Sequence, residues 1–249
     1  MSLYAVSIIM TEGLDQTGEG CRSEVDFMSK RETTKTREDT VRREDGGNQE
    51  FAPVEFIFDK KLIKPPLLLH SCCGPCSAPV IEDLIREYAV TVYYYNPNIT
   101  DPEEYKKRLE SQEKAIKEFN GKIDKLGVVG FIEGKYEPDY FYNEVRGLEN
   151  EPERGERCEV CVKLRLEKTA GAAILGGFDG FATTLSLSPH KDFNMISRIG
   201  RDLFLKYGIS FVETDYRNTG GYQRSIELSK KYSLYRQKYC GCEFSKGEK

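Results

Sequence analysis

Seven of the eight cysteines in this 249-residue chain fall into three short blocks. The blocks HSCCGPCS, RCEVC and YCGC contain Cys72, Cys73, Cys76, Cys158, Cys161, Cys240 and Cys242. Blocks so far apart in sequence form one site only if the fold brings their sulfurs together. Clustered thiolates are the usual ligands of zinc ions and iron–sulfur clusters. The sequence therefore predicts a protein-ligated metal centre.

Counting ligands sharpens this prediction. A tetrahedral zinc ion or an iron–sulfur cubane takes about four thiolates. Seven thiolates exceed the needs of one such centre and fall short of two all-cysteine centres. Some of them must hold a second metal together with other ligands, or leave a position open for substrate. One or two structural zinc sites with extra buried cysteines are the alternative, and Cys21 is expected to bind nothing.

The composition indicates one sizeable α/β domain in a reducing compartment. The chain has no basic start followed by a long apolar run, and no stretch near the roughly 18 apolar residues of a membrane helix. We therefore expect a cytoplasmic protein that contacts no membrane. Disulfides are disfavoured in the cytoplasm, so eight cysteines point to metal or redox chemistry.

The first part of the chain differs in composition from the rest. Residues 11–50 are rich in Glu, Arg, Thr, Gly and Asp and show no sustained apolar period. Such a segment cannot bury enough surface to offset its chain entropy. We predict that residues 1–62 form a poorly ordered extension and that residues 63–249 form the folded domain.

Alternating strands and helices predict a mainly parallel, doubly wound sheet. The run Leu67–Leu69 suits a buried strand, the first cysteine block forms the turn after it, and Pro79 is expected in the first turn of the next helix. A second strand is predicted over 90–95 and a helix over 102–119. Ligands of such sheets bind at the carboxyl ends of the strands, where the first cysteine block falls.

The second half continues the same pattern. Cys158 and Cys161 open a helix predicted to reach residue 175, with both sulfurs on one face and with pKa values lowered by the helix N-terminus. Further strands are predicted over 178–185 and 211–214, and helices over 188–207 and 222–232. Gly241 allows the bend that both neighbouring cysteines need to face one site.

The C-terminal region is basic although the whole chain carries a net charge of −4. Residues 186–249 carry 12 Lys and Arg against 7 Asp and Glu, a local charge of +5. The candidate nucleic-acid contacts are Arg217, Arg224, Lys230, Lys231, Arg236 and Lys238. These cations form either a solvated helix face or a footprint for a phosphate backbone.

Two other activities fit the sequence less well. Cys73-Gly-Pro-Cys76 matches the thioredoxin dithiol, but the chain has no tryptophan, and the two other cysteine blocks would go unexplained. Neither SGGxDS nor GxxxxGK[ST] occurs, so ATP is not expected. His70, at the end of the first strand, is interpreted as a packed residue or one that supports the ligands.

Four segments together resemble the QueH family of epoxyqueuosine reductases: LLLHSCCGPCS, ERCEVCVKLRLEKTA, FATTLSLSPHK and ETDYRNTGGYQRSIELSKKYSLYRQKYCGC. The resemblance runs from about Leu67 to Ser245. It implies a HUP-type, nucleotide-hydrolase-like Rossmannoid domain. It also implies an oxidoreductase that converts epoxyqueuosine at the tRNA wobble position to queuosine, with a ferredoxin or flavodoxin as the type of electron donor.

The resemblance further implies a [4Fe-4S] cluster beside a separately bound iron. The seven clustered cysteines would supply both, and Cys76 is the first candidate for the lone iron because relatives can carry aspartate there. An open iron position would act as a Lewis acid on the epoxide oxygen. Candidate proton donors are Asp215, Tyr222 and His190. A non-catalytic zinc-binding RNA or protein adaptor is the alternative function.

Overall fold

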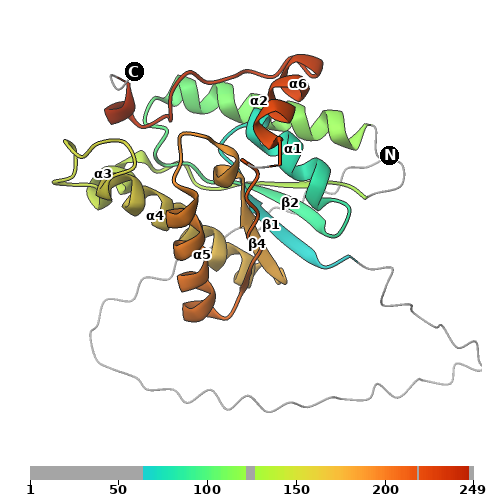
Figure 1. Cartoon of the computed structure of the whole chain (residues 1–249), viewed down its shortest axis with the longest axis horizontal. Coiled ribbons are helices and arrows are strands. Elements are labelled where there is room, and N and C mark those ends of the chain that lie inside the picture. The colour runs from blue at the N-terminus through green and yellow to red at the C-terminus, as the bar shows by residue number, and fades with distance from the viewer. Residues whose placement is uncertain (1–63, 122–126, 218, 247–249) are drawn as a thin grey trace, which may run out of the picture. The chain divides into compact units, whose positions relative to one another are not determined.

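The computed structural model of the chain describes residues 64–121, 127–217 and 219–246 (Figure 1). The predicted extension over residues 1–62 and Cys21 lie outside these ranges. The described strands form one sheet in the order β3-β2-β1-β4-β5, and every neighbouring pair is parallel. The strands are β1 (Pro66–His70), β2 (Ala89–Tyr94), β3 (Gly130–Glu133), β4 (Gly180–Thr183) and β5 (Ser210–Phe211).

Helices cover both faces of this sheet, as Figure 1 shows. They are α1 (Gly74–Leu84), α2 (Pro102–Asn120), α3 (Pro138–Glu144), α4 (Glu156–Leu175), α5 (Phe193–Tyr207) and α6 (Gly221–Lys231), with short 3-10 helices η2 (Thr184–Leu187) and η3 (Glu243–Ser245). Helices α1, α2 and α6 lie on one side, and α4 and α5 lie on the other. The predicted doubly wound α/β fold is confirmed.

The leucines of β1 show why this strand lies at the centre. Leu67 and Leu69 pack into the core beneath α1 and α2, whereas Leu68 packs against α4 and α5. Successive side chains of a strand point to opposite faces, so a continuous apolar run suits a strand covered on both sides. All three leucines are fully buried, and each contributes about 1.5–3 kcal/mol of hydrophobic stabilisation.

The strand order places a topological switch point between β1 and β4. The chain leaves β1 through α1 to reach β2 on one side, and later returns through α4 to β4 on the other side. A crevice forms outside the carboxyl ends of the strands at such a point. Two loops meet there: the first cysteine block after β1, and the segment Ser188–Lys191 after β4 and η2.

Some boundaries differ from the predictions. Helix α1 begins at Gly74, one turn earlier than expected, so Pro75 rather than Pro79 occupies its first turn and Pro79 lies inside the helix. Helix α5 begins at Phe193 because the Asp192 side chain accepts hydrogen bonds from the backbone N–H groups of Asn194 (2.9 Å) and Met195 (3.3 Å).

Other elements differ in extent or were missed. Strand β5 covers two residues, 210–211, rather than 211–214. Strand β3 and helix α3 were not predicted. No helix in the described ranges is both long enough and apolar enough to cross a membrane.

Candidate metal centre and adjoining cavity

The first cysteine block forms a compact thiolate group at the start of α1. Cys73 is the N-cap residue of that helix, and the sulfurs of Cys72, Cys73 and Cys76 all lie within 4.8 Å of one another. Within the described ranges, no other set of three Cys, His, Asp or Glu ligand atoms is this close. A single ion with metal–sulfur bonds of about 2.3 Å places its thiolates about 3.8 Å apart. This group therefore has nearly the spacing that one metal ion needs.

Hydrogen bonds within the group favour one thiolate over the other two. The thiols of Cys73 and Cys76 donate to the sulfur of Cys72 and hold its pKa well below the usual range. The same hydrogen bond to Cys72 raises the pKa of Cys73 to about 12, and that of Cys76 is also raised. A bound cation would displace the remaining thiol protons, because metals bind the thiolate form.

The other two blocks meet beside this group. Cys158 and Cys161 lie in the first turns of α4, and they line a small cavity together with Cys240 and Cys242 of the C-terminal segment. No three of these four sulfurs satisfy the 4.8 Å spacing that the first block shows. A cubane is larger than one ion, so wider spacing of four thiolates suits a cluster better than a single metal.

Burial changes the acidity of these cysteines. It raises the pKa of Cys161 and raises that of Cys242 to about 12. The predicted lowering of the Cys161 pKa by the helix N-terminus is therefore wrong, because desolvation outweighs the helix dipole in a buried thiol. Cys240 behaves oppositely: burial opposes its ionisation, but the charges of Lys191 and Arg165 outweigh burial and lower its pKa.

Arg108 anchors the C-terminal cysteine segment to α2. Its guanidinium is 1% exposed, forms a 2.8 Å ion pair with Glu104, and donates to the carbonyls of Tyr239 (3.0 Å) and Cys240 (2.9 Å). The backbone N–H of Thr100 adds a 3.2 Å bond to the carbonyl of Gly241. These contacts hold the CGC turn in place, although it lies far from the other cysteine blocks in the sequence.

Arg154 connects the α4 cysteines to the loop after β4. Its backbone N–H donates to the sulfur of Cys158 at 3.3 Å, and its side chain donates to the carbonyls of Pro189 (3.0 Å) and His190 (3.2 Å). Arg154 adopts a left-handed φ of 72°, which is costly for a residue with a side chain. The surrounding contacts maintain this strained conformation at the rim of the site.

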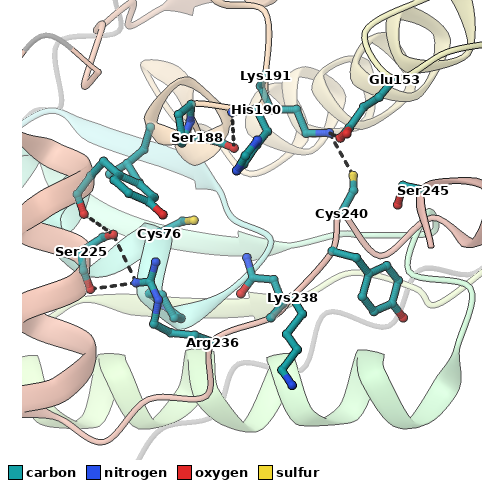
Figure 2. Close-up of a pocket in the computed structure, with 16 residues that line it drawn as sticks. Cys76, Glu153, Ser188, His190, Lys191, Ser225, Arg236, Lys238, Cys240 and Ser245 are labelled. Carbon is teal, nitrogen blue, oxygen red and sulfur yellow. Dashed lines mark hydrogen bonds and ion pairs between the residues drawn. The ribbon is translucent and has the colours of Figure 1, made fainter. Parts of the chain in front are cut away.

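A cavity of about 210 Å³ opens next to both cysteine groups. Its lining includes Cys76 and Cys240, and Figure 2 shows their sulfurs on either side of the open space. The loop after β4 contributes His190 and Lys191, and the C-terminal part of the chain contributes Arg236. A ligand in this cavity would contact thiolates from two blocks and polar side chains from two further segments.

Lys191 forms part of the cavity wall, although it was not among the predicted site residues. Its Nζ lies 2.9 Å from the sulfur of Cys240 and 3.7 Å from a carboxylate oxygen of Glu153 (Figure 2). Burial lowers the pKa of Lys191, but the thiolate of Cys240 raises it by more, so the ammonium stays charged. The only sequence signal was its position next to His190, a predicted proton donor.

The predicted site residues are distributed unevenly around this cavity. His190 and Tyr222 line it, whereas the carboxylate of Asp215 is held by the guanidinium of Arg217 at 2.9 and 3.0 Å. His70 is fully buried, with Nδ1 3.0 Å from the Thr183 hydroxyl and Nε2 3.1 Å from the Tyr95 carbonyl. Both of its ring nitrogens are engaged, in keeping with a packed residue.

The cations of the predicted nucleic-acid footprint also differ in their surroundings. Arg236 and Lys238 line the cavity, and Arg236 donates to Ser225 and Ser229 in α6. Arg224 is paired with Glu82 and Glu227, as Arg217 is with Asp215. Lys230 and Lys231 at the end of α6 are exposed.

Buried polar atoms near the cysteines support a site that receives further groups. Both amide atoms of Asn98, which is 1% exposed, have no hydrogen-bond partner among the described residues, and neither does Oε1 of Gln237. Nε2 of Gln237 donates to the sulfur of Cys73 at 3.1 Å, and the residue lines the cavity. Buried polar atoms normally find partners, so these atoms and the seven sulfurs fit bound metal and substrate.

The fold and the site define a doubly wound α/β protein with a thiolate centre that opens into a cavity at the switch point of its sheet. The sequence matches the family described as "Epoxyqueuosine reductase QueH" over residues 67–248. The chain belongs to this family of oxidoreductases.

Curated relatives agree with the family match. The chain is 40% identical over 189 residues to the epoxyqueuosine reductase QueH of Streptococcus pyogenes serotype M1, covering 76% of this chain and 73% of the relative. It is 40% identical over 184 residues to the protein of that name from Staphylococcus epidermidis, covering 73% and 76%. The Haemophilus influenzae protein of that name is 39% identical over 181 residues, covering 72% and 71%.

Proposed function

We propose that this protein reduces the epoxide of epoxyqueuosine at the wobble position of tRNA and so forms queuosine. One observation carries the proposal beyond the family match: the cavity places Cys76 and Cys240, from two separate blocks, against the same open space. Substrate in that space would lie directly beside the thiolate centre. The conversion consumes two electrons and two protons. It forms the C=C bond of the cyclopentene and releases the epoxide oxygen as water.

The seven clustered cysteines would hold a [4Fe-4S] cluster and one neighbouring iron. We assign Cys158 and Cys161 to the cluster and Cys76 to the single iron. The remaining ligand positions fall to Cys72, Cys73, Cys240 and Cys242. When bound, the cluster supplies single electrons and the iron supplies an open Lewis-acid position.

Side chains of the cavity would bind and orient the substrate. Oε1 of Gln237 is an available acceptor for an N–H or O–H group of the nucleoside. Lys191 stays charged beside Cys240 and holds that sulfur in place. His190 and Tyr222 line the cavity and are the proton donors that we propose, whereas Asp215 is committed to Arg217.

The proposed activity can be tested with anaerobically purified protein. We expect about five irons per chain, four in the cubane and one beside it, and a broad visible absorption. With a ferredoxin, a flavodoxin or a chemical reductant, this protein should convert epoxyqueuosine-containing tRNA to queuosine without cobalamin, detected by nucleoside mass spectrometry.

Two results would contradict the proposal. Fully iron-loaded protein that does not convert this tRNA would exclude the activity. Colourless protein with stoichiometric zinc would favour the other candidate, a zinc-binding RNA or protein adaptor, which the same thiolates can support.

We propose that tRNA contacts the exposed lysines in the last turn of α6, Lys230 and Lys231. Neutralising Lys230 and Lys231 together should weaken tRNA binding and reduce the slope of log affinity against log salt by about 1 to 2, because each phosphate contact releases counterions. Arg224→Gln is the matched control, since Glu82 and Glu227 already neutralise that guanidinium. An unchanged slope in the double variant would exclude this footprint and leave the proposed reaction intact.

We also propose that residues 63–249 form the catalytic domain. Every described strand and all seven clustered cysteines lie after residue 63. A chain lacking residues 1–62 should keep the melting temperature and iron content of the full chain. Insoluble protein, or protein that loses iron, would show that the first 62 residues support the domain.

A further inference from the structure

Arg165 lies inside the protein without the partner that a buried cation normally has. The residue is 2% exposed, and its Nε donates to the carbonyl of Cys161 at 3.1 Å, one turn earlier in α4. It forms no salt bridge with any carboxylate in the described ranges. A buried charge without compensation costs several kcal/mol, so something else must balance this guanidinium.

The acidic groups that act on Arg165 are cysteines rather than carboxylates. Burial alone would lower its pKa, but the charges of cysteines from all three blocks raise it. These cysteines are Cys161, Cys240, Cys72 and Cys158. Arg165 also lines the small cavity that holds the sulfurs of Cys158, Cys161, Cys240 and Cys242. It is therefore a cation placed between the cysteine groups.

Two other cations near the cysteines, Arg108 and Lys191, differ in this respect. Arg108 pairs with Glu104 at 2.8 Å, and Lys191 lies 3.7 Å from Glu153. Each of these cations is paired with a carboxylate of the protein, and this carboxylate offsets much of the charge that the cation would exert on more distant groups. The guanidinium of Arg165 has no carboxylate partner among the described residues, so its charge would act directly on the centre that the cysteines hold.

We propose that Arg165 is the internal counter-ion of the metal centre and raises its reduction potential. This inference rests on the proposed iron–sulfur function. Reduction adds negative charge to the centre, and a nearby buried cation stabilises the reduced form more than the oxidised form. Water screens little at this depth, so the electrostatic effect of one charge is large.

The test compares full-length variants that differ in one charge. Arg165→Gln removes the charge and keeps an amide donor for the Cys161 carbonyl, whereas Arg165→Lys keeps the charge. Lys163→Gln is the matched control, because Lys163 lies on the same helix and is exposed to water. The measurements are iron content and a redox titration of anaerobic protein, followed by visible absorption and electron paramagnetic resonance.

We expect Arg165→Gln to shift the equilibrium between oxidised and reduced cluster at least tenfold toward the oxidised form, which is about 59 mV for one electron. Arg165→Lys and Lys163→Gln should remain close to wild type. Failure of Arg165→Gln to load iron, with normal loading of Arg165→Lys, would equally support the role of the charge.

Two outcomes would overturn the inference. One is a fully loaded Arg165→Gln protein with the wild-type potential. The other is equal loss of loading in Arg165→Gln and Arg165→Lys, which would indicate a role of shape rather than charge. Neither outcome affects the proposed reaction, which fails instead if wild-type protein lacks iron or turnover.

Discussion

Replacing Cys161 with serine is expected to abolish the iron–sulfur chromophore and to reduce epoxyqueuosine reduction by about 100-fold or more. Loss of a residue that only supports a metal ligand already costs about 10- to 100-fold, and loss of a ligand costs more. Cys161 is buried with its pKa raised by burial, so only a bound metal would keep it as a thiolate. Visible spectroscopy, iron analysis and turnover of anaerobic protein check the prediction.

Serine is nearly isosteric with cysteine, so the Cys161→Ser protein should remain folded, as circular dichroism would report. Cys21→Ser is the matched control, because Cys21 lies outside the three blocks and should be dispensable for iron binding. If Cys161→Ser protein kept its full iron content and colour, Cys161 would not be a cluster ligand. The cluster would then have to draw its ligands from the other six clustered cysteines.

Local patterns were sufficient to predict most of the sheet. The three leucines of β1 are continuous, and β2 is apolar except for Thr91, because both faces of a central parallel strand are covered. Strand β3 was missed; it has only four residues, GFIE, and its side chains are half-buried or exposed. Strand β5 has two residues, too few for any period to be visible.

The cysteine blocks could be predicted as a metal site because clustered cysteines are usual metal ligands in proteins. The residues that hold those cysteines in place could not be predicted. Arg165 was an ordinary helical arginine in the sequence, and the role that we propose for it depends on cysteines as distant in sequence as Cys72, 93 residues earlier. Arg108 bonds to carbonyls 131 and 132 residues later. Such contacts exist only after the chain has folded.

Charge counting overstated the cationic surface for the same reason. The local charge of +5 is correct for the sequence, yet Arg224 pairs with Glu82 from α1, 142 residues earlier. A carboxylate from outside the counted segment thus neutralises one of its cations. The exposed lysines of α6 remain because no such partner reaches them by salt bridge within the described ranges.

Replacing Gly241 with alanine is expected to reduce iron content below half and to lower turnover by more than tenfold. Gly241 has a φ of 108°, a conformation that residues with a side chain rarely adopt. An added Cβ would lie 2.9 Å from Cγ1 of Ile99 and 3.1 Å from Nη1 of Arg108. The turn would have to shift, and Cys240 and Cys242 would move with it.

Gly208→Ala separates this effect from backbone strain alone. Gly208 has a φ of 72° at the end of α5, and no atom lies within 4 Å of the position that its Cβ would take. That substitution should cost about 1–2 kcal/mol and lower the melting temperature by a few degrees, with unchanged iron per folded chain. Equal iron content in the two variants would show that the geometry of the CGC turn does not control the metal centre. Loss of iron in Gly241→Ala alone would show that the two C-terminal sulfurs must be held where Arg108 and the turn place them.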